Sequence, residues 1–246
     1  MDCAMLMENT QNTGSICKFS IVIPVLNEAD RISSLISNLR MQSSENFYEI
    51  IVVDGDPQGT TVKVIHDSKV MSITADRGRA RQMNAGAAIA GGEVLIFLHA
   101  DTLLPPKALN KISGVLENEK YVGGAFSLGI DSDRLLLKYV AARASMRSRI
   151  NRIPYGDQAI FIRKSYFDKI GGFKEIPLME DVDLMRRIKK RGDIIYIFSD
   201  QVMTSPRRWE KEGIVYTTIR NQILVSLYFL GVGPEKLVKY YRRHSE

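Results

Sequence analysis

Three apolar runs in the first half of this chain each end in a polar cluster that carries an acid. The runs and the acids that follow them are 19–24 with Glu28, 49–53 with Asp54, and 94–98 with Asp101. Short continuous runs rich in Val and Ile are typical of parallel strands covered by helices on both faces. Ligands of open α/β sheets bind beyond the carboxyl ends of the strands. We therefore expect the three clusters to converge on one site for a cation or a polar ligand.

Strands and helices alternate along this half of the chain. Expected helices at 28–41, 62–65 and 77–90, and one beginning at Pro105, alternate with the three apolar strands and a strand at 70–74. This rhythm predicts an α/β fold with a doubly wound, mostly parallel sheet flanked by helices.

The second half changes character but contains no linker. We expect a strand opening at Gly123, a basic helix at 134–151, a strand at 158–162, a helix at 180–191 and C-terminal helices at 214–230 and 234–241. A length of 246 residues fits one large α/β domain. The predicted organisation is a loose tail at 1–17 and a single domain at 18–246. Within it, 18–104 is the nucleotide-binding half, 105–210 the acceptor half and 211–246 the C-terminal helices.

The formal net charge of +6 indicates an anionic partner. No nucleic-acid-binding motif is present, so nucleoside diphosphates or an anionic membrane surface explain the charge better. Cys3 and Cys17, both in the tail, favour a reducing compartment without a disulfide framework. The longest apolar stretch, 223–233, is about half of the roughly 20 residues that a spanning helix needs. We expect a cytoplasmic protein able to contact the inner face of the membrane peripherally.

The acids at the strand ends have a functional and a structural interpretation. Asp101 suits a hard divalent cation that also binds phosphate, since such ions take one or two protein carboxylates. It could instead cap the helix that follows. Asn27-Glu28 and Asp54 could likewise cap helices or bind a base and ribose. His99, as a lone histidine, could be structural or a ligand.

Arg77, Arg81 and Asn84 fall on one face of the expected helix at 77–90. Arginines oppose the helix dipole at this end, which makes sense if a phosphate lies against the helix start. The alternative is a solvated basic face.

The helix that begins at Glu180 carries the candidate general base. Asp181 shares its helical face with apolar residues three, four and seven positions later, so we expect it to face a cleft. Glu180 and Asp183, with Arg187, are expected to turn outward.

Two further segments have alternative interpretations. Arg208 and Trp209 could clamp a diphosphate and wall a sugar site, or form a cation–π pair on the surface. The segment 214–241 could lie at a membrane surface or subunit contact, or pack on the core.

Taken together, these motifs resemble an inverting family 2 glycosyltransferase with the GT-A nucleotide-sugar fold. The motifs, between about 19 and 209, are Ile23-Pro24-Val25-Leu26-Asn27-Glu28, Val53-Asp54-Gly55, Phe97-Leu98-His99-Ala100-Asp101, and Glu180-Asp181 after Gly171-Gly172-Phe173. The segments 156–158, 179–184 and 207–209 are similar to a bacterial subgroup known as radical-SAM/selenodomain-associated transferases.

The resemblance implies a role for each matching residue. Glu28 and Asp54 would hold the base and ribose, Arg81 would approach the diphosphate, Asp101 would carry Mg²⁺ or Mn²⁺, and Asp181 would be the general base. The nucleotide-sugar side would comprise Pro24, Asn27, Glu28, Asp54, Arg77, Arg81, Asn84, His99 and Ala100. The acceptor side would comprise Gly156, Asp157, Gln158, Glu180, Arg208 and Trp209. This sequence departs from the family pattern at two places. His99 stands where the family usually has an acid, and Asp56-Pro57 replaces the usual small residues after Asp54.

The predicted function is metal-dependent transfer of a sugar from a nucleoside-diphosphate sugar to a hydroxyl acceptor. A sugar-phosphate nucleotidyltransferase is an alternative, but it would need a Gly-rich, Lys-bearing loop after the first strand, unlike Asn27-Glu28-Ala29-Asp30. A non-catalytic basic module for membrane or nucleic acid would leave Asp181 without a role.

Overall fold

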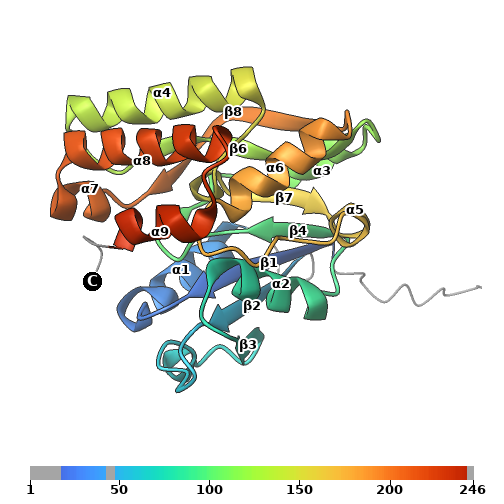
Figure 1. Ribbon diagram of the computed structural model, residues 1–246. Helices are drawn as coiled ribbons and strands as arrows, with labels where there is room; N and C mark the ends of the chain where they lie inside the picture. Colours follow the sequence, from blue (N-terminus) through green and yellow to red (C-terminus); the bar gives the residue numbers. More distant parts are fainter. Residues whose placement is uncertain (1–17, 43–47, 243–246) are drawn as a thin grey trace, which may run out of the picture.

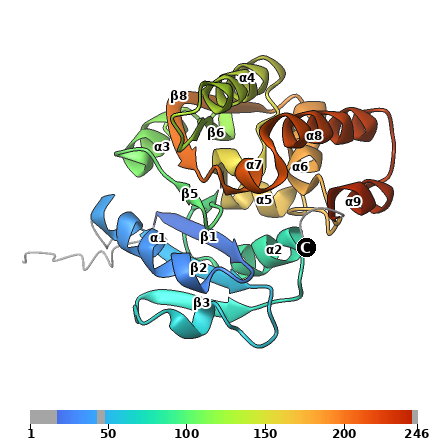
Figure 2. The same ribbon diagram turned by 90° about the vertical axis from the view of Figure 1, so that its left-hand side faces the viewer.

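The computed structural model describes residues 18–42 and 48–242 (Figure 1). The predicted loose tail at 1–17, with both cysteines, lies outside these residues. Within them, one eight-stranded sheet forms the centre, with helices on both faces (Figures 1 and 2). The strands are β1 (Phe19–Val25), β2 (Tyr48–Asp54), β3 (Val70–Thr74), β4 (Val94–Phe97), β5 (Thr102–Leu103), β6 (Tyr121–Ile130), β7 (Ile160–Arg163) and β8 (Ile194–Thr204).

The sheet has the strand order β3-β2-β1-β4-β7-β6-β8-β5. Its first four strands are all parallel, which confirms the α/β prediction for this half. Beyond β4 the sheet is mixed: β7 runs antiparallel to both neighbours, β6 and β8 are parallel, and β5 is antiparallel to β8. The sequence did not predict β8 or the short β5.

The described helices enclose the sheet from two sides. They are α1 (Ala29–Gln42), α2 (Arg79–Ile89), α3 (Ala108–Leu116), α4 (Leu135–Asn151), α5 (Lys164–Lys169), α6 (Glu180–Lys190), α7 (Arg207–Glu212), α8 (Ile214–Phe229) and α9 (Pro234–Arg242), with 3₁₀ turns at Val62–Val64 and Gly156–Gln158. One core cluster packs α1, α3 and α4 on one face, and a second packs α2, α6 and α8 on the other. This burial on both faces explains the uninterrupted apolar strands.

Backbone conformation moves several predicted boundaries. The helix expected from Arg77 begins at Arg79, because Gly78 adopts φ 144° at its N-cap. The helix expected from Pro105 begins at Ala108, after Lys107 in the left-handed region at φ 58°. The strand expected from Gln158 begins at Ile160, because the preceding residues form the 3₁₀ turn.

The C-terminal helices pack onto the core through part of their surface. Leu224 and Val225 of α8 and Leu237 of α9 are buried in the second core cluster. Packing on the core therefore accounts for one face of this segment, while the opposite face of α8 stays exposed. Within 18–42 and 48–242, no helix is both long and apolar enough to span a bilayer.

Candidate functional site

The carboxyl ends of β1 and β2 are joined by one buried amide. Gln82 of α2 donates its side-chain N–H bonds to the carbonyls of Val25 and Val53, across 2.7 and 2.9 Å. Gly86, one turn further along α2, lets the helix approach closely, since a Cβ there would lie 2.4 Å from Val22. The two strand ends are thus held in register beside the start of α2.

Glu28 and Asp101 face this edge of the sheet. Glu28 follows Asn27, which has a left-handed φ of 56°, and its carboxylate accepts from Arg207 at 2.9 Å. Burial, and then the negative charge of Glu28, raises the pKa of Asp101. Asp101 is thus a partly desolvated carboxylate close to a second one, an arrangement that favours a cation or donor nearby.

His99 contributes a neutral imidazole. Burial lowers its pKa well below the usual range, and the charges of Arg79 and Arg208 lower it further. Its buried Nε2 has no hydrogen-bond partner among the described residues. A Cβ at Gly156 would lie 2.9 Å from this nitrogen, so the ring faces the Gly156 backbone.

Asp181 lies at the same place, from the first turn of α6. Its Oδ2 accepts the backbone N–H of Gly156 at 2.6 Å, and its Oδ1 accepts that of Val182 at 2.7 Å. Met179, with φ 70°, turns the chain into the helix so that this turn meets the 156–158 turn. The side chain is partly exposed, as a proton acceptor for a bound substrate must be.

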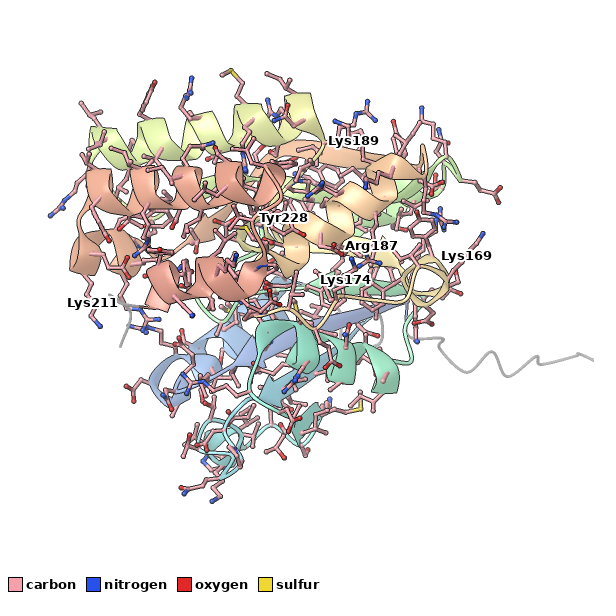
Figure 3. The ribbon with its side chains drawn as sticks, viewed as in Figure 1. Lys169, Lys174, Arg187, Lys189, Lys211 and Tyr228 are labelled. Carbon is pink, nitrogen blue, oxygen red and sulfur yellow. The ribbon has the colours of Figure 1, made fainter. Side chains whose placement is uncertain are left out.

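The prediction that Glu180 and Asp183 turn outward is wrong. Glu180 is only 4% exposed and lies 3.7 Å from Arg79, and burial followed by the charge of Asp181 raises its pKa to about 7. Asp183 is also buried. It binds Arg187, one turn later on α6, at 2.7 Å and Lys174 at 3.2 Å, and it accepts from Tyr228 of α8 at 3.4 Å; Figure 3 labels these three partners. The two acids do not face solvent, because Lys174 and Tyr228 lie against Asp183 and Arg79 of α2 lies close to Glu180.

Asp157 and Arg147 are two further charged groups that interact with Asp181. Burial and then the charge of Asp181 raise the pKa of Asp157 to about 6, and its Oδ1 is buried without a described hydrogen-bond partner. Arg147 of α4 stacks on Tyr155 with its guanidinium carbon 3.2 Å from the ring centroid. Burial lowers the pKa of Arg147 to about 10, and its Nη2 likewise has no partner among the described residues.

Arg208 and Trp209 lie on α7, and the charge of Arg208 acts on His99 and Asp101. Arg208 hydrogen-bonds to the hydroxyl of Tyr241, and its guanidinium lies 4.9 Å from the centroid of that ring. Trp209 is partly buried, and its Nε1 is buried without a partner in the part of the chain described. Tyr241 therefore connects α9 to the candidate site.

Several predicted site residues form hydrogen bonds that hold neighbouring turns in place. Gln158 donates to Phe126 and Ser148 and accepts from Tyr155, which holds the 156–158 turn in place. Asp54 is fully buried, and its two oxygens accept backbone N–H bonds from Asp56, Thr61 and Val62. Asp54 therefore caps the following 3₁₀ turn, which is the structural interpretation of this residue. Contact between Asp54 and a ribose stays a prediction.

The predicted phosphate face of α2 is arranged differently from the expectation. Asn84 clamps the backbone of Phe173, donating at 2.8 Å and accepting at 3.0 Å. Arg81 pairs with Glu175 at 3.1 Å, and Arg77 is exposed before the helix. Of the predicted nucleotide-side residues, Pro24 and Ala100 line the strand ends without a polar side chain.

Sequence reasoning missed Arg79, Arg147, Tyr155 and Tyr241. Arg79 lies between Arg77 and Arg81, which were predicted from the sequence. Gly78 precedes the first residue of α2 and could have indicated that Arg79 begins the helix. Nothing in the sequence distinguishes Arg147 from the other cations of its helix, because only the tertiary fold buries it.

The donor set is compatible with a divalent cation delivered together with a nucleotide. No group of three His, Cys, Asp or Glu side chains among the described residues could hold a metal ion alone. Asp101 offers one carboxylate, and His99 offers an unprotonated nitrogen. Mg²⁺ bound through phosphates needs only one or two protein carboxylates, so these residues fit such an ion.

Three buried polar atoms with no described partner belong to residues of this cluster, on His99, Arg147 and Asp157, and a fourth lies on Trp209 of α7. A buried polar atom left unpaired costs about 1–3 kcal/mol. Both donors and acceptors are present among them. The arrangement therefore favours a ligand that carries several hydroxyl groups, next to a carboxylate able to accept a proton.

Comparison with known protein families matches residues 20–174 to the model of glycosyl transferase family 2. A relative named uncharacterized glycosyltransferase, from Haemophilus influenzae, is 26% identical over 236 residues, which covers 92% of this chain and 76% of that protein. A dolichol-phosphate mannosyltransferase from Pyrococcus furiosus is 31% identical over 107 residues, covering 41% of this chain and 30% of that protein.

Solved structures show a similar fold. S. aureus TarS 1-349 superposes with a TM-score of 0.60 at 17% identity, covering 91% of this chain and 69% of that one. Mannosyltransferase PcManGT from Pyrobaculum calidifontis, in complex with GDP-Man and Mn²⁺, gives a TM-score of 0.59 at 21% identity, covering 76% and 56%. At these identities the likeness establishes a shared fold.

Proposed function

This chain belongs to glycosyl transferase family 2 and is a glycosyltransferase, and from that premise we propose that it moves a sugar from a nucleoside diphosphate to a hydroxyl acceptor with inversion, Asp181 serving as general base. The observation that carries the proposal is the position of Asp181. Its carboxylate meets Gly156 at 2.6 Å, beside a buried cluster of unpaired hydrogen-bonding atoms. Placement in the radical-SAM-associated subgroup stays a prediction.

In the proposed reaction, the acceptor hydroxyl lies against Asp181 and gives its proton to that carboxylate as the oxygen attacks the anomeric carbon. The bond between this carbon and the diphosphate breaks on the opposite face, which inverts the configuration. The Gly156 N–H bond to Oδ2 orients the carboxylate, and the orphaned atoms of Asp157 and Arg147 bind hydroxyl groups of the sugar or the acceptor.

The departing diphosphate needs positive charge around it. Arg79 and Arg208 act electrostatically on both His99 and Asp101, so both guanidinium groups lie close to the place assigned to the diphosphate. Asp101 would hold Mg²⁺ or Mn²⁺, which would supply further neutralisation of the leaving group. Mn²⁺ and GDP-Man in the PcManGT complex, and UDP-GlcNAc in a TarS complex, support this choice of partners.

The family match favours glycosyl transfer over the nucleotidyltransferase alternative. We assign the nucleotide, the sugar and the acceptor by chemical class only. Location in the cytoplasm also remains part of the proposal.

The direct test uses purified protein and a panel of UDP- and GDP-sugars with Mg²⁺ or Mn²⁺. Thermal shift identifies the nucleotide, and release of nucleoside diphosphate with candidate hydroxyl acceptors measures turnover. Proton NMR of the product then gives the anomeric configuration. A product with retained configuration would refute Asp181 as the base of a single displacement.

A further inference from the structure

Helices α4 and α8 together expose an apolar face. The two helices pack against each other and lie side by side at the outside of the molecule (Figures 1 and 2). The apolar residues of this face, which we call the α4–α8 face, are half or more exposed: Leu135, Tyr139, Met146 and Ile150 on α4, and Val215, Ile219, Ile223 and Leu230 on or just after α8.

The spacing of these residues places them on one stripe of each helix. On α4 and on α8 the steps between them are four or seven residues, which is the repeat of one helical face. The opposite stripes, with Leu137 and Ala141 on α4 and Leu224 on α8, are buried in the core. Single exposed apolar residues are normal, but several on one stripe of each of two packed helices mark an interaction surface.

The border of this face on α4 is mainly positive, and Lys138 pairs with the exposed Asp133 at 3.6 Å. Between residues 134 and 156 the sequence has no acid, while Arg134, Lys138 and Arg143 are exposed. Between 214 and 233 the one charged residue is Arg220, whose side chain is 7% exposed and pairs with Glu212 at 2.7 Å. The face therefore combines exposed apolar side chains with a positive border.

We propose that the α4–α8 face docks on the surface of an anionic phospholipid bilayer. An apolar stripe with Lys and Arg beside it matches the boundary between acyl chains and negative headgroups. A second copy of this chain fits less well. A two-fold contact would bring Arg134, Lys138 and Arg143 of one copy close to the same cations of the other, and of these three Lys138 alone pairs with an acid, Asp133, within the described residues.

Docking of this kind would place the acceptor side of the site near the lipid. Arg147 of α4 stacks on Tyr155, and the chain after this helix leads directly to Tyr155 and Gly156. The docking proposal does not depend on the proposed reaction, because it rests on exposed residues outside the site.

The test is vesicle flotation of the full chain with phosphatidylcholine alone and with phosphatidylglycerol added. We expect binding to the anionic vesicles that weakens as salt is raised. Replacing Arg134 and Arg143 together by Gln should lower partitioning about fivefold for each cation removed. Neither side chain forms an ion pair within the described residues, so the fold should not change.

A second variant, Ile150→Gln with Ile219→Gln and Ile223→Gln, removes apolar surface and should lower partitioning about tenfold or more. Matched controls are Met41→Gln, which removes an apolar side chain that is 78% exposed on α1, and Lys63→Gln in the turn beside β3. Both controls should bind like the wild type. Absence of wild-type binding, equal binding by all variants, or a wild-type dimer that the Ile variant dissociates would each overturn the proposal.

Discussion

The backbone N–H of Gly156 donates to Oδ2 of Asp181 across 2.6 Å, and this bond joins the 156–158 turn to the first turn of α6. Two segments 25 residues apart thus fix one carboxylate oxygen. A general base works only when it is held in one orientation toward the proton that it removes. Several predicted effects of substitution depend on this contact.

Asp181→Asn tests the base directly. The amide oxygen can still accept the Gly156 N–H bond, so fold and nucleotide affinity should persist, while turnover falls roughly 10²-fold or more because the amide cannot take a proton. Initial rates and calorimetric binding of the nucleoside diphosphate measure the two effects. Asp168→Asn on α5, at an exposed carboxylate, is the control. Wild-type turnover in the Asp181 variant would exclude the assignment.

Gly156→Ala should impair the site without unfolding the protein. The new Cβ would lie 2.9 Å from His99 Nε2 and 3.4 Å from Asp181 Oδ2, so the imidazole must shift. We expect turnover to fall about tenfold or more, because the shifted imidazole would no longer be aligned with the reacting groups. Gly114→Ala is the matched control, because nothing lies within 4 Å of a Cβ there. Since Gly114 is inside α3, that change should raise stability by about 0.5–1 kcal/mol.

Asp183→Asn should act on stability rather than on chemistry. The buried carboxylate holds Arg187, Lys174 and Tyr228, so the neutral amide leaves part of this network unpaired. We expect a loss of about 1–3 kcal/mol in the free energy of unfolding. Chemical denaturation of this variant beside Asp168→Asn measures the loss. A midpoint unchanged from the wild type would mean that the network contributes nothing.

Glu180 should make stability depend on pH. Its pKa is about 7 in the folded protein against an ordinary value of 4.5, so the folded state binds more protons than the unfolded state between these values. The contribution of Glu180 to stability therefore falls as pH rises from about 4.5 to about 7. The melting temperature of the wild type relative to Glu180→Gln should decline across this window. A constant difference would contradict the raised pKa.

Metal dependence is expected because Asp101 alone cannot neutralise a leaving diphosphate. Excess chelator should abolish turnover, and restored Mg²⁺ or Mn²⁺ should recover it. Asp101→Ala should remove the metal-dependent part of nucleotide binding, as measured by calorimetry with and without the ion. Full activity in chelator would show that arginine charges suffice.

The sequence predicted the parallel half of the sheet well and the mixed half less well. The apolar runs at β1, β2 and β4 are short, continuous and bounded by polar clusters, so their identity is a local property. The irregular burial along β8 depends on its pairing with β6, which is distant in sequence. Its eleven residues gave no comparable local signal.

The helical phase of α6 was informative for Asp181 and misleading for its neighbours. Phase predicts which side chains share a face, and Leu184, Met185 and Ile188 are buried as expected. Phase cannot predict that a second layer will cover the other face. Lys174 before α6 and Tyr228 of α8 lie against Asp183, and Arg79 of α2 lies close to Glu180.

The sequence by itself determined the α/β class, the placement of acids at the strand ends and the family resemblance, because strand period and local motifs follow from neighbouring residues. Tertiary structure decided which polar residues meet. It selected Arg79 instead of Arg77 or Arg81 through the backbone angle of Gly78, and it assigned Gln158 and Asn84 to backbone clamps. The physical reason is that burial and hydrogen-bond pairing depend on contacts between segments far apart in the chain, which no local pattern records.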